Sequence, residues 1–410
     1  MNLNDIKEKL NFKDKFDRMK RRLKKNAFVS FFYDMMAEDI RFEDLPIEAM
    51  NSSYFKSDFW NRRIDDLHER SKRMSLCCTY MEGDYYRFQG VKDLRKVNCC
   101  HDRFCDNCQN ALSVQRSDKY LPVLLKLADD YDLYHVVLTV PNCTLSGLSA
   151  TLDKMYYAYK RLCIFLSGRK NVRSVDYSAF GYLGSIRALE ITKNNESNTF
   201  HPHFHCIFVC KKGSKLDTKR YHINPYSFKG NNSHIKRKHK VLFDGHEIEA
   251  PDRLFSALEI LLQKTWYLLY NHIELNRSNI DELSLGYSCL IDNAKGRYKE
   301  VFKYATKGLL SSDPNADPKD KYEDFVLLFF TLFRRRLIQG YGCMYRMEFD
   351  NKIDMSPDEL YLEVRKALHA IETPIAFYST FEETEREIES TSGITYISRK
   401  SIAQLGCKDE

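Results

Sequence analysis

Apolar positions along the chain switch between helical and strand spacing in an irregular order. They recur at helical spacing over residues 111–128 and 145–166, and Thr144 precedes the second run as a candidate N-cap. β-Branched and aromatic residues dominate three shorter segments, which are Tyr134–Val140, Tyr182–Thr192 and His203–Cys210. The mixture predicts an α+β fold with a mainly antiparallel central sheet flanked by helices, because regular βαβ units would give strict alternation.

The rest of the chain adds elements around this centre. Helical spacing returns at residues 254–272, 297–309, 321–337 and 356–370, and one further strand is expected at 285–292. We expect four parts: a basic helical N-terminal extension (1–70), a cysteine-rich segment with a helix (71–130), a main domain (131–347) with a basic insertion (211–250), and a C-terminal helix with an acidic tail (348–410).

Composition sets limits on the class of protein. A chain of 410 residues with 43% hydrophobic residues can bury a sizeable core. The net charge of +7 is mild, so the position of the basic residues matters more than their total. The basic run at residues 18–25 fits a solvated helix face or an arm that contacts phosphates. The N-terminus lacks a signal-peptide pattern and the chain lacks a long apolar run, which predicts a cytoplasmic protein.

The 13 cysteines are expected to be reduced thiols or metal ligands in such a compartment. Cys100, Cys105 and Cys108 follow a Cys-x4-Cys-x2-Cys spacing, which predicts a structural Zn²⁺ site that lacks one ligand. Cys77 or Cys78 could supply the fourth thiolate, with Cys99 and His101 as competitors. The alternative interpretation is a set of buried free thiols.

A second group of candidate ligands lies on the predicted strands. His203 and His205 flank Phe204, and alternate residues of a strand share one face, so both imidazoles are expected on one side with Phe204 in the core behind. Glu190, between apolar neighbours on the preceding strand, is the expected third ligand, because an unpaired buried carboxylate would be costly. His201 is a rival ligand, although Pro202 is expected to disturb the strand there. His135 is interpreted as a core histidine or one that supports a ligand.

Residues 300–307 form a third candidate group on a predicted helix. Glu300, Tyr304 and Lys307 recur at helical spacing and would share one face, and Lys303 adjoins the tyrosine. Taken alone, this pattern is typical of an amphipathic helix with a solvent-facing glutamate and a half-buried tyrosine. A tyrosine nucleophile, with an ordinary pKa near 10, would need a metal ion and positive charge beside it.

Together these motifs resemble a known family. Residues 136–142 (VVLTVPN), then ALEIT followed by HPHFHCIFV, then EVFKYATKG, resemble in order the three motifs of the initiators of rolling-circle plasmid replication, which are HUH endonucleases. The branch with an HPHFH motif and a single tyrosine is the most similar. The Cys-x2-Arg-x-Cys-x2-Cys spacing ahead of the first motif also occurs in this family.

The resemblance implies the roles of individual residues. His203 and His205 correspond to the pair that binds Mg²⁺ or Mn²⁺, Tyr304 to the nucleophile and Glu300 to the carboxylate that activates water in the terminating step, while Lys303 and Lys307 match the basic residues beside the tyrosine. The implied activity is site-specific nicking and joining of single-stranded origin DNA through a 5′-phosphotyrosyl intermediate. The implied partners are supercoiled plasmid DNA and the helicase and polymerase of a bacterial host.

The basic insertion is the expected DNA contact. Residues 211–240 interleave ten Lys and Arg residues with aromatics and contain one acidic residue, a pattern used to hold phosphates and stack bases. A solvated loop is the alternative interpretation. The candidate DNA-binding residues are Lys211, Lys212, Lys236, Arg237 and Lys238.

Two other functions fit part of the pattern. An HUH transposase would share the histidine motif, but the positions four residues from Tyr304 hold Glu300 and Gly308 rather than a second tyrosine. A zinc-stabilised nucleic-acid-binding protein without nuclease activity would keep the cysteines and the basic insertion, but would not need Glu300 and Tyr304 as a pair.

Overall fold

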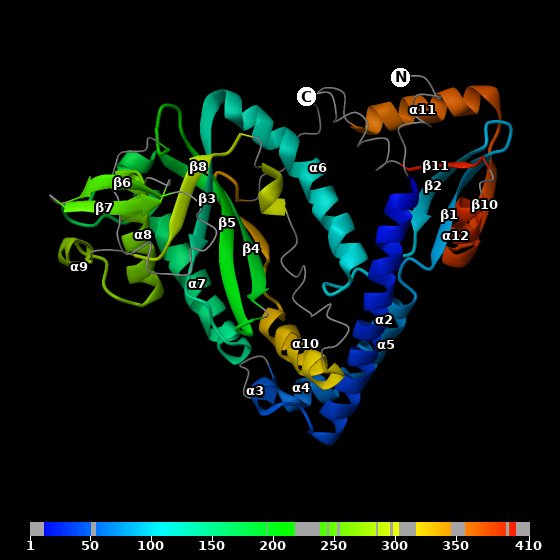
Figure 1. The fold of residues 1–410 in the computed structure, drawn as a ribbon, viewed down its shortest axis with the longest axis horizontal. Helices are drawn as coiled ribbons and strands as arrows, with labels where there is room; N and C mark the ends of the chain where they lie inside the picture. The colour runs from blue at the N-terminus through cyan, green and yellow to red at the C-terminus, as the bar shows by residue number, and fades with distance from the viewer. Residues whose placement is uncertain are drawn as a thin grey trace. The chain divides into compact units, whose positions relative to one another are not determined.

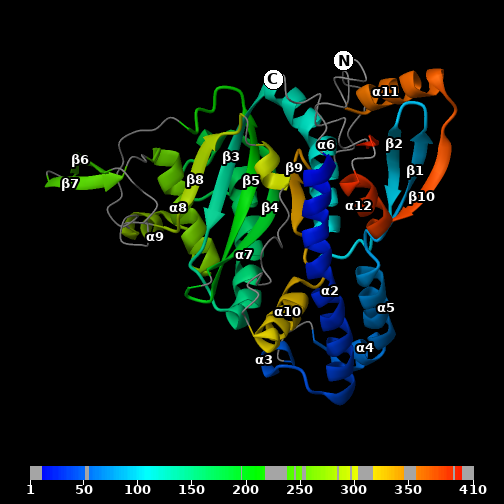
Figure 2. The ribbon, with the colours of Figure 1, turned by 45° about the vertical axis from the view of Figure 1, so that its right-hand side comes forward.

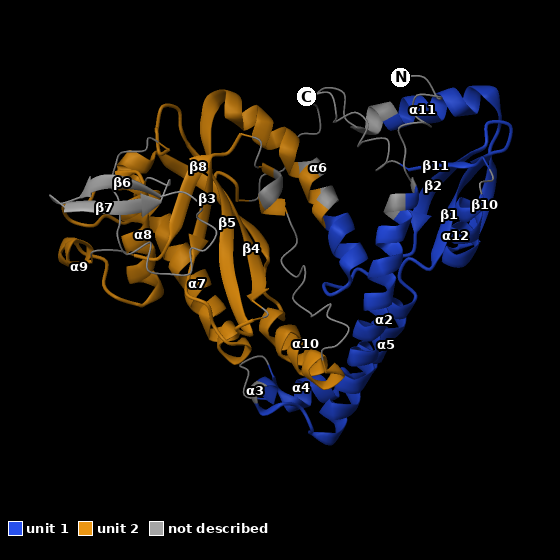
Figure 3. Cartoon of the chain, in the orientation of Figure 1, with its two compact units in different colours: residues 1–112, 350–410 blue, residues 113–349 orange. Residues whose placement is uncertain are grey.

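The structure is a computed structural model in which the chain forms two compact units, residues 1–112 with 350–410 and residues 113–349 (Figure 3). The first unit thus joins the two ends of the sequence, and the boundary falls within one helix. The structure describes residues 12–50, 55–194, 196–217, 238–243, 246–251, 255–283, 286–295, 298–302, 317–345, 357–390 and 393–398.

The first unit contains a four-stranded sheet of order β10-β1-β2-β11, in which β11 runs parallel to β2 and the other neighbours are antiparallel. Helix α11 packs on one face through Tyr361, Val364 and Leu368, and α2 and α12 pack on the other (Figure 2). Its elements are α2 (Phe12–Phe42), α3 (Ile47–Met50), α4 (Ser57–Asn61), α5 (Ile64–Ser75), β1 (Tyr80–Tyr86), β2 (Val91–Val97), α11 (Pro357–Ile371), β10 (Ile375–Thr380), α12 (Phe381–Glu389) and β11 (Thr395–Ile397).

The sequence pattern did not predict this sheet. Strands β1 and β2 carry Asp84 and Asp93 at buried positions, which breaks the alternation of apolar and polar residues. The carboxylates are tolerated there because Arg365 of α11 reaches both of them, at 3.0 Å from Asp84 and 3.1 Å from Asp93. A register shift between Glu82 and Gly83 obscures the pattern further.

The second unit contains a five-stranded sheet of order β8-β3-β5-β4-β9, in which all neighbours are antiparallel (Figure 1). The predicted fold class, α+β with antiparallel sheets flanked by helices, is confirmed. The elements that follow the boundary are α6 (Asp106–Asp130), β3 (Tyr131–Thr139), α7 (Leu145–Leu166), η1 (Ser178–Phe180), β4 (Tyr182–Asn194), β5 (Thr199–Lys211), β6 (Lys238–Phe243), β7 (His246–Pro251), α8 (Ala257–Tyr270), α9 (Arg277–Glu282), β8 (Cys289–Asn293), η3 (Tyr298–Phe302), α10 (Pro318–Leu332) and β9 (Ile338–Gly342).

The two faces of this sheet are covered by different elements. On one face, Phe204 is fully buried and contacts Tyr159 of α7 and Trp266 of α8. On the other face, α6 and η3 pack on Ile186, Ile207 and Val209. Burial of one large apolar side chain in such a layer stabilises the fold by about 1.5–3 kcal/mol. Because η3 shares a cluster with β4 and β5, it is held against the face opposite Phe204.

Several predicted elements need correction. The helix expected at residues 321–337 begins at Pro318 and ends at Leu332, and the residues after it turn through a left-handed Arg334 (φ 56°) into edge strand β9. Of the helix expected at 297–309, the described residues Tyr298–Phe302 form a 3₁₀ helix, and residues 303–316 lie outside the described part.

Pro202 does not disturb its strand. Strand β5 runs through this residue, which pairs with Ile191 of β4. The ladder between β5 and β3 ends opposite His203, one residue before Pro202 is reached, so the missing N–H of the proline interrupts no bond of that ladder. The predicted N-cap is confirmed, since the Thr144 hydroxyl accepts the N–H of Gly147 at the start of α7.

None of the described helices is long and apolar enough to span a membrane.

Candidate metal centre

Three side chains meet on the face of the second sheet that η3 and α6 cover further along. Glu190 of β4 pairs directly with His203 of β5, and His205 lies two residues further along β5 on the same face. The Glu190 Oε2 atom lies 2.7 Å from His205 Nε2 and 3.3 Å from His203 Nε2. The three potential ligand atoms all lie within 4.8 Å of one another. The register of two long strands therefore gathers these three residues.

The ionised carboxylate and the two imidazoles of this group favour the binding of a cation. Hydrogen bonds with His203 and His205 hold the pKa of the Glu190 carboxyl well below its usual range. The Nδ1 atom of His203 lies 3.1 Å from the carbonyl oxygen of His201, an acceptor that leaves His203 Nε2 free to bind a metal ion. Two imidazole nitrogens and one carboxylate oxygen suit Mn²⁺ or a similar divalent ion.

His201 stands beside this group without belonging to it. Its ring centre lies 5.1 Å from that of His203, but His201 is not among the three residues whose ligand atoms lie within 4.8 Å of one another, which are Glu190, His203 and His205. Burial lowers the pKa of His201 to about 4, so its ring is neutral at pH 7.

His135 is buried next to the group. Its Nε2 atom lies 3.0 Å from Nδ1 of His205, and the two rings stack at 5.2 Å between centres with 10° between their planes. The sequence offered one signal for this contact, since His135 lies on a predicted strand just before the first motif. It could not show which strand lies beside β5.

The segment that leads to the predicted nucleophile is anchored on the same face of the sheet. Val301 and Phe302 of η3 are fully buried, Phe302 stacks on Tyr120 of α6 at 5.4 Å, and the carbonyl oxygen of Phe302 accepts a hydrogen bond from Ser113 at 2.6 Å. Tyr298 is 6% exposed, and burial raises the pKa of its phenol. Lys303, Tyr304 and Lys307 lie outside the described residues, as does the side chain of Glu300.

A second candidate metal group lies in the first unit. Cys77, Cys100, Cys105 and Cys108 are all buried, with their sulfur atoms within 4.8 Å of one another. The Sγ atom of Cys77 lies 3.5 Å from that of Cys105 and 3.6 Å from that of Cys108. Four thiolates placed about 2.3 Å from one tetrahedral ion would lie about 3.8 Å apart, so the group fits a metal ion.

Backbone N–H groups surround these sulfur atoms. Cys108 N–H donates to Cys105 Sγ at 3.4 Å, and His101 N–H donates to Cys108 Sγ at 3.3 Å. Such donors stabilise thiolates in the way a bound cation requires. Of the competing ligands, Cys78 adopts a left-handed backbone (φ 62°) and is not part of the group, and Cys99 is exposed.

The predicted DNA-binding residues are only partly described. Lys211 and Lys212 are exposed at the end of β5, and Lys212 donates to the carbonyl oxygen of Ala128 at 3.0 Å. Lys236, Arg237 and the side chain of Lys238 lie outside the described residues, although the backbone of Lys238 begins β6.

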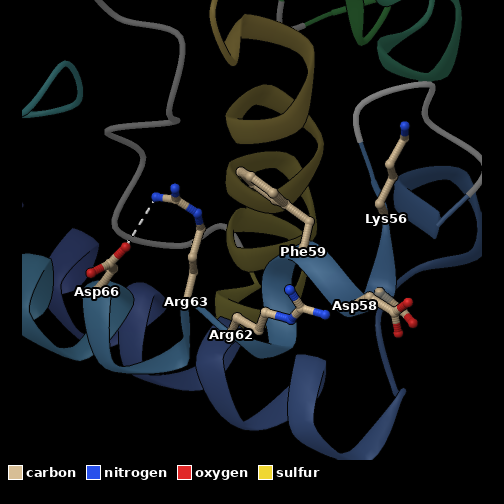
Figure 4. Close-up of a pocket in the computed structure, with 7 residues that line it drawn as sticks. Lys56, Asp58, Phe59, Arg62, Arg63 and Asp66 are labelled. Atoms are coloured by element: carbon tan, nitrogen blue, oxygen red, sulfur yellow. Dashed lines mark hydrogen bonds and ion pairs between the residues drawn. The ribbon is translucent and has the colours of Figure 1, made fainter.

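A surface pocket in the first unit shares no residue with either metal group. The side chains that line it carry both signs of charge, and Arg63 pairs with Asp66 at 3.1 Å and covers the ring of Phe59 (Figure 4).

Part of the chain is similar to a known protein family. Residues 91–224, about a third of the chain, match a family model described as replication protein. This segment is therefore similar to the replication-protein family. It contains Cys100, Cys105 and Cys108 as well as the Glu190–His203–His205 group, but it ends before η3. The resemblance to replication initiators is thereby confirmed, whereas the assignment to a particular branch stays a prediction.

Individual relatives match the chain over segments of similar length. The chain is similar to Protein rep of Staphylococcus aureus, with 29% identity over 137 residues that cover 32% of this chain and 53% of the relative. It is similar to Protein rep of Bacillus amyloliquefaciens, with 25% identity over 35% of this chain and 40% of the relative, and to Protein rep of Streptococcus pneumoniae, with 26% identity over 32% and 39%. The matched region spans about half of these relatives or less. No solved structure matches the chain.

Proposed function

We propose that this protein initiates rolling-circle replication of a plasmid by nicking one strand of the origin and joining it again. The observation that carries the proposal is the convergence of Glu190, His203 and His205 within 4.8 Å inside a replication-protein domain. A domain that only bound DNA would have no need for this pair of imidazoles beside a carboxylate.

The donor set of this group supports a catalytic rather than a structural ion. Three protein ligands leave coordination positions open for phosphate oxygens, whereas the four thiols of the first unit would close a tetrahedral site. When bound, Mg²⁺ or Mn²⁺ would polarise the scissile phosphate and stabilise the charge on its oxygens. Glu190, His203 and His205 would hold this ion, and the cysteine group would hold Zn²⁺ with a structural role.

Tyr304 is the proposed nucleophile. The chain spans at most about 3.6 Å per residue, so the two-residue step from buried Phe302 to Tyr304 covers at most about 7 Å. Phe302 packs in one cluster with Ile207, which lies two residues from His205 on the same face of β5. This anchor supports a position of Tyr304 near the metal ligands. Tyr298 is a poor alternative because its phenol is buried.

Tyr304 would react with the scissile phosphate by transesterification. The Tyr304 oxygen bonds to phosphorus, the bond from phosphorus to the 3′ oxygen breaks, and the phenol proton passes to solvent as the leaving 3′ oxygen gains one. Lys303 and Lys307 would stabilise the phenolate and the negative charge on the phosphate. In the terminating cleavage, Glu300 would act as general base for a water molecule, so a second tyrosine is unnecessary.

DNA and host proteins are the proposed partners. Lys211, Lys212, Lys236, Arg237 and Lys238 would contact phosphates of single-stranded or supercoiled origin DNA, because counterions released from the backbone favour such contacts. The helicase and polymerase of a bacterial host would extend the 3′ end.

A covalent adduct tests this function. The protein is incubated with Mn²⁺ and a single-stranded oligonucleotide from the origin of its plasmid, and the products are separated on a denaturing gel. We expect an adduct with the wild-type protein and with Tyr298→Phe, which removes only a buried hydroxyl, and none with Tyr304→Phe or His203→Ala. An adduct that survives Tyr304→Phe would move the nucleophile elsewhere. Binding without any adduct would favour a zinc-stabilised binding protein.

A further inference from the structure

A row of four polar side chains crosses the central sheet of the second unit. Glu190 lies on β4, His205 on β5, His135 on β3 and Asp292 on β8, and these strands are consecutive neighbours. The proposed catalytic ion uses only the first two of these residues. His135 and Asp292 have no role in the chemistry described above.

The contact between the two histidines is close and enclosed. His205 pairs directly with Val137, so His135, two residues away on β3, is its diagonal neighbour on the same face. The His135 Nε2 atom lies 3.0 Å from His205 Nδ1, and the side chain of His135 is buried at 6% exposure. Stacked rings at 10° limit the rotation of either imidazole.

This hydrogen bond can be made in two ways, and only one serves a metal ion. If His135 donates, a neutral His205 carries its proton on Nε2, the atom that faces Glu190, and cannot bind a cation there. If His205 donates from Nδ1, its Nε2 presents a lone pair to the ion. The second arrangement requires an unprotonated Nε2 on His135, and therefore a proton on its Nδ1.

Asp292 favours the arrangement that serves the ion. It pairs directly with His135 in the register of β3 and β8, and cross-strand partners extend their side chains from the same face with Cβ atoms about 4.5–5.5 Å apart. A carboxylate accepts hydrogen bonds and cannot donate them. The Asp292 carboxylate therefore favours the tautomer of His135 that carries its proton on Nδ1, because this N–H can donate to a carboxylate.

We infer that His135 and Asp292 are positioning residues that fix the tautomer of His205 and so raise the affinity of the site for its divalent ion. The inference rests on the metal centre of the proposed function. Hydrogen-bond partners of metal-binding histidines change metal affinity by about 10- to 100-fold when they are removed.

The affinity for Mn²⁺ tests the inference without reference to DNA cleavage. Free Mn²⁺ is measured by electron paramagnetic resonance during titration of the full chain with its cysteine site loaded with Zn²⁺. His135→Phe keeps a ring that can stack on His205 and removes the nitrogen that accepts the hydrogen bond from His205. We expect the dissociation constant for Mn²⁺ to be about 10- to 100-fold larger. His135→Gln returns an amide oxygen near the Nε2 position and should restore most of the affinity. A variant that acted only by loosening the fold would not be rescued in this way.

Control variants separate the possible failures. Tyr134→Phe, on the same strand, removes a hydroxyl that accepts the N–H of Leu216 at 3.3 Å, and should leave Mn²⁺ affinity unchanged. If His135→Phe also leaves it unchanged, the role of His135 is wrong while the metal centre stands. If the wild-type protein and His203→Ala bind Mn²⁺ equally, the metal centre itself is wrong.

Asp292→Asn tests the outer member of the row. An amide can donate to His135 and would favour the unproductive tautomer, so we expect a weaker affinity in the same direction as His135→Phe. An affinity equal to that of the wild-type protein would overturn the role of Asp292.

Discussion

Each histidine of the candidate metal centre has a partner for its Nδ1 atom. His203 has the carbonyl oxygen of His201, and His205 has the ring of His135. Both Nε2 atoms consequently face Glu190, which lies between them in space. The direction of the rings therefore depends on the backbone and on a buried neighbour as much as on the two histidines themselves.

The choice between Cys77 and Cys78 gives a prediction at the scale of one residue. Cys77→Ser should remove a ligand and lower bound zinc from one ion per chain to a small fraction of this, because three thiolates hold the ion far less tightly. Cys78→Ser should retain one ion, since its sulfur lies outside the group. Zinc content by atomic absorption after gel filtration measures both variants. Loss of zinc in Cys78→Ser with retention in Cys77→Ser would contradict the assignment.

Spacing alone could nominate three of these thiols but not the fourth. Cys100, Cys105 and Cys108 follow one another within a turn and a helix start, so local geometry relates them. Cys77 and Cys78 are neighbours in the sequence, and only the structure shows that the sulfur of Cys77 lies in the group while Cys78 adopts a left-handed backbone. A backbone turn of this kind is set by packing and is not encoded by a residue such as glycine.

At the scale of elements, strands β4 and β5 determine the metal centre. The alternation of β5 was readable from the sequence because buried residues of one face, such as Phe204, alternate with less buried ones, and so the shared face of His203 and His205 was predictable. The register between β4 and β5 was not readable, because the turn between the two strands does not fix it by its residue types. The pairing of Glu190 with His203 comes from the whole ladder of twelve residue pairs.

The link between β2 and α11 gives a prediction about stability. Asp93 is fully buried, and it accepts hydrogen bonds from the Tyr361 hydroxyl at 2.8 Å and pairs with Arg365. Asp93→Ala should lower the free energy of unfolding by about 3–5 kcal/mol, because it removes one of the two acidic partners of Arg365 and leaves the Tyr361 hydroxyl without its acceptor. Tyr361→Phe should cost only about 1–3 kcal/mol. Urea unfolding measures the stability of both variants. Equal losses of stability would show that the ion pair between Asp93 and Arg365 adds nothing to the hydrogen bond from Tyr361.

The contact between β2 and α11 could not be predicted from the sequence, for a physical reason. A buried carboxylate on a strand looks like a solvent-facing position until its partner is known, and the partner of Asp93 lies 268 residues away on α11. Long-range pairs of this kind leave no local pattern. The same holds for the strands of the first unit that come from the C-terminal segment.

At the scale of the whole molecule, charge is divided between the two units. Residues 113–349 contain 35 Lys and Arg against 25 Asp and Glu, whereas the rest of the chain contains 29 against 32. The excess positive charge thus lies in the unit that carries the histidine pair. This distribution favours contact of that unit with a polyanion.

We propose that the phenol of Tyr304 meets a divalent ion held by Glu190, His203 and His205. The direct measurement is ¹⁹F NMR of protein in which Tyr304 is replaced by 3-fluorotyrosine, titrated with Mn²⁺ in the presence of a single-stranded origin oligonucleotide. A paramagnetic ion broadens nearby resonances. Protein labelled at Tyr157, on α7 and on the opposite face of the sheet, is the control.

We predict that one equivalent of Mn²⁺ broadens the resonance at position 304 beyond detection and broadens the resonance at position 157 much less. The same titration of a His203→Ala background should leave both sharp. A resonance at position 304 that stays sharp while Mn²⁺ saturates the histidine site would contradict the account.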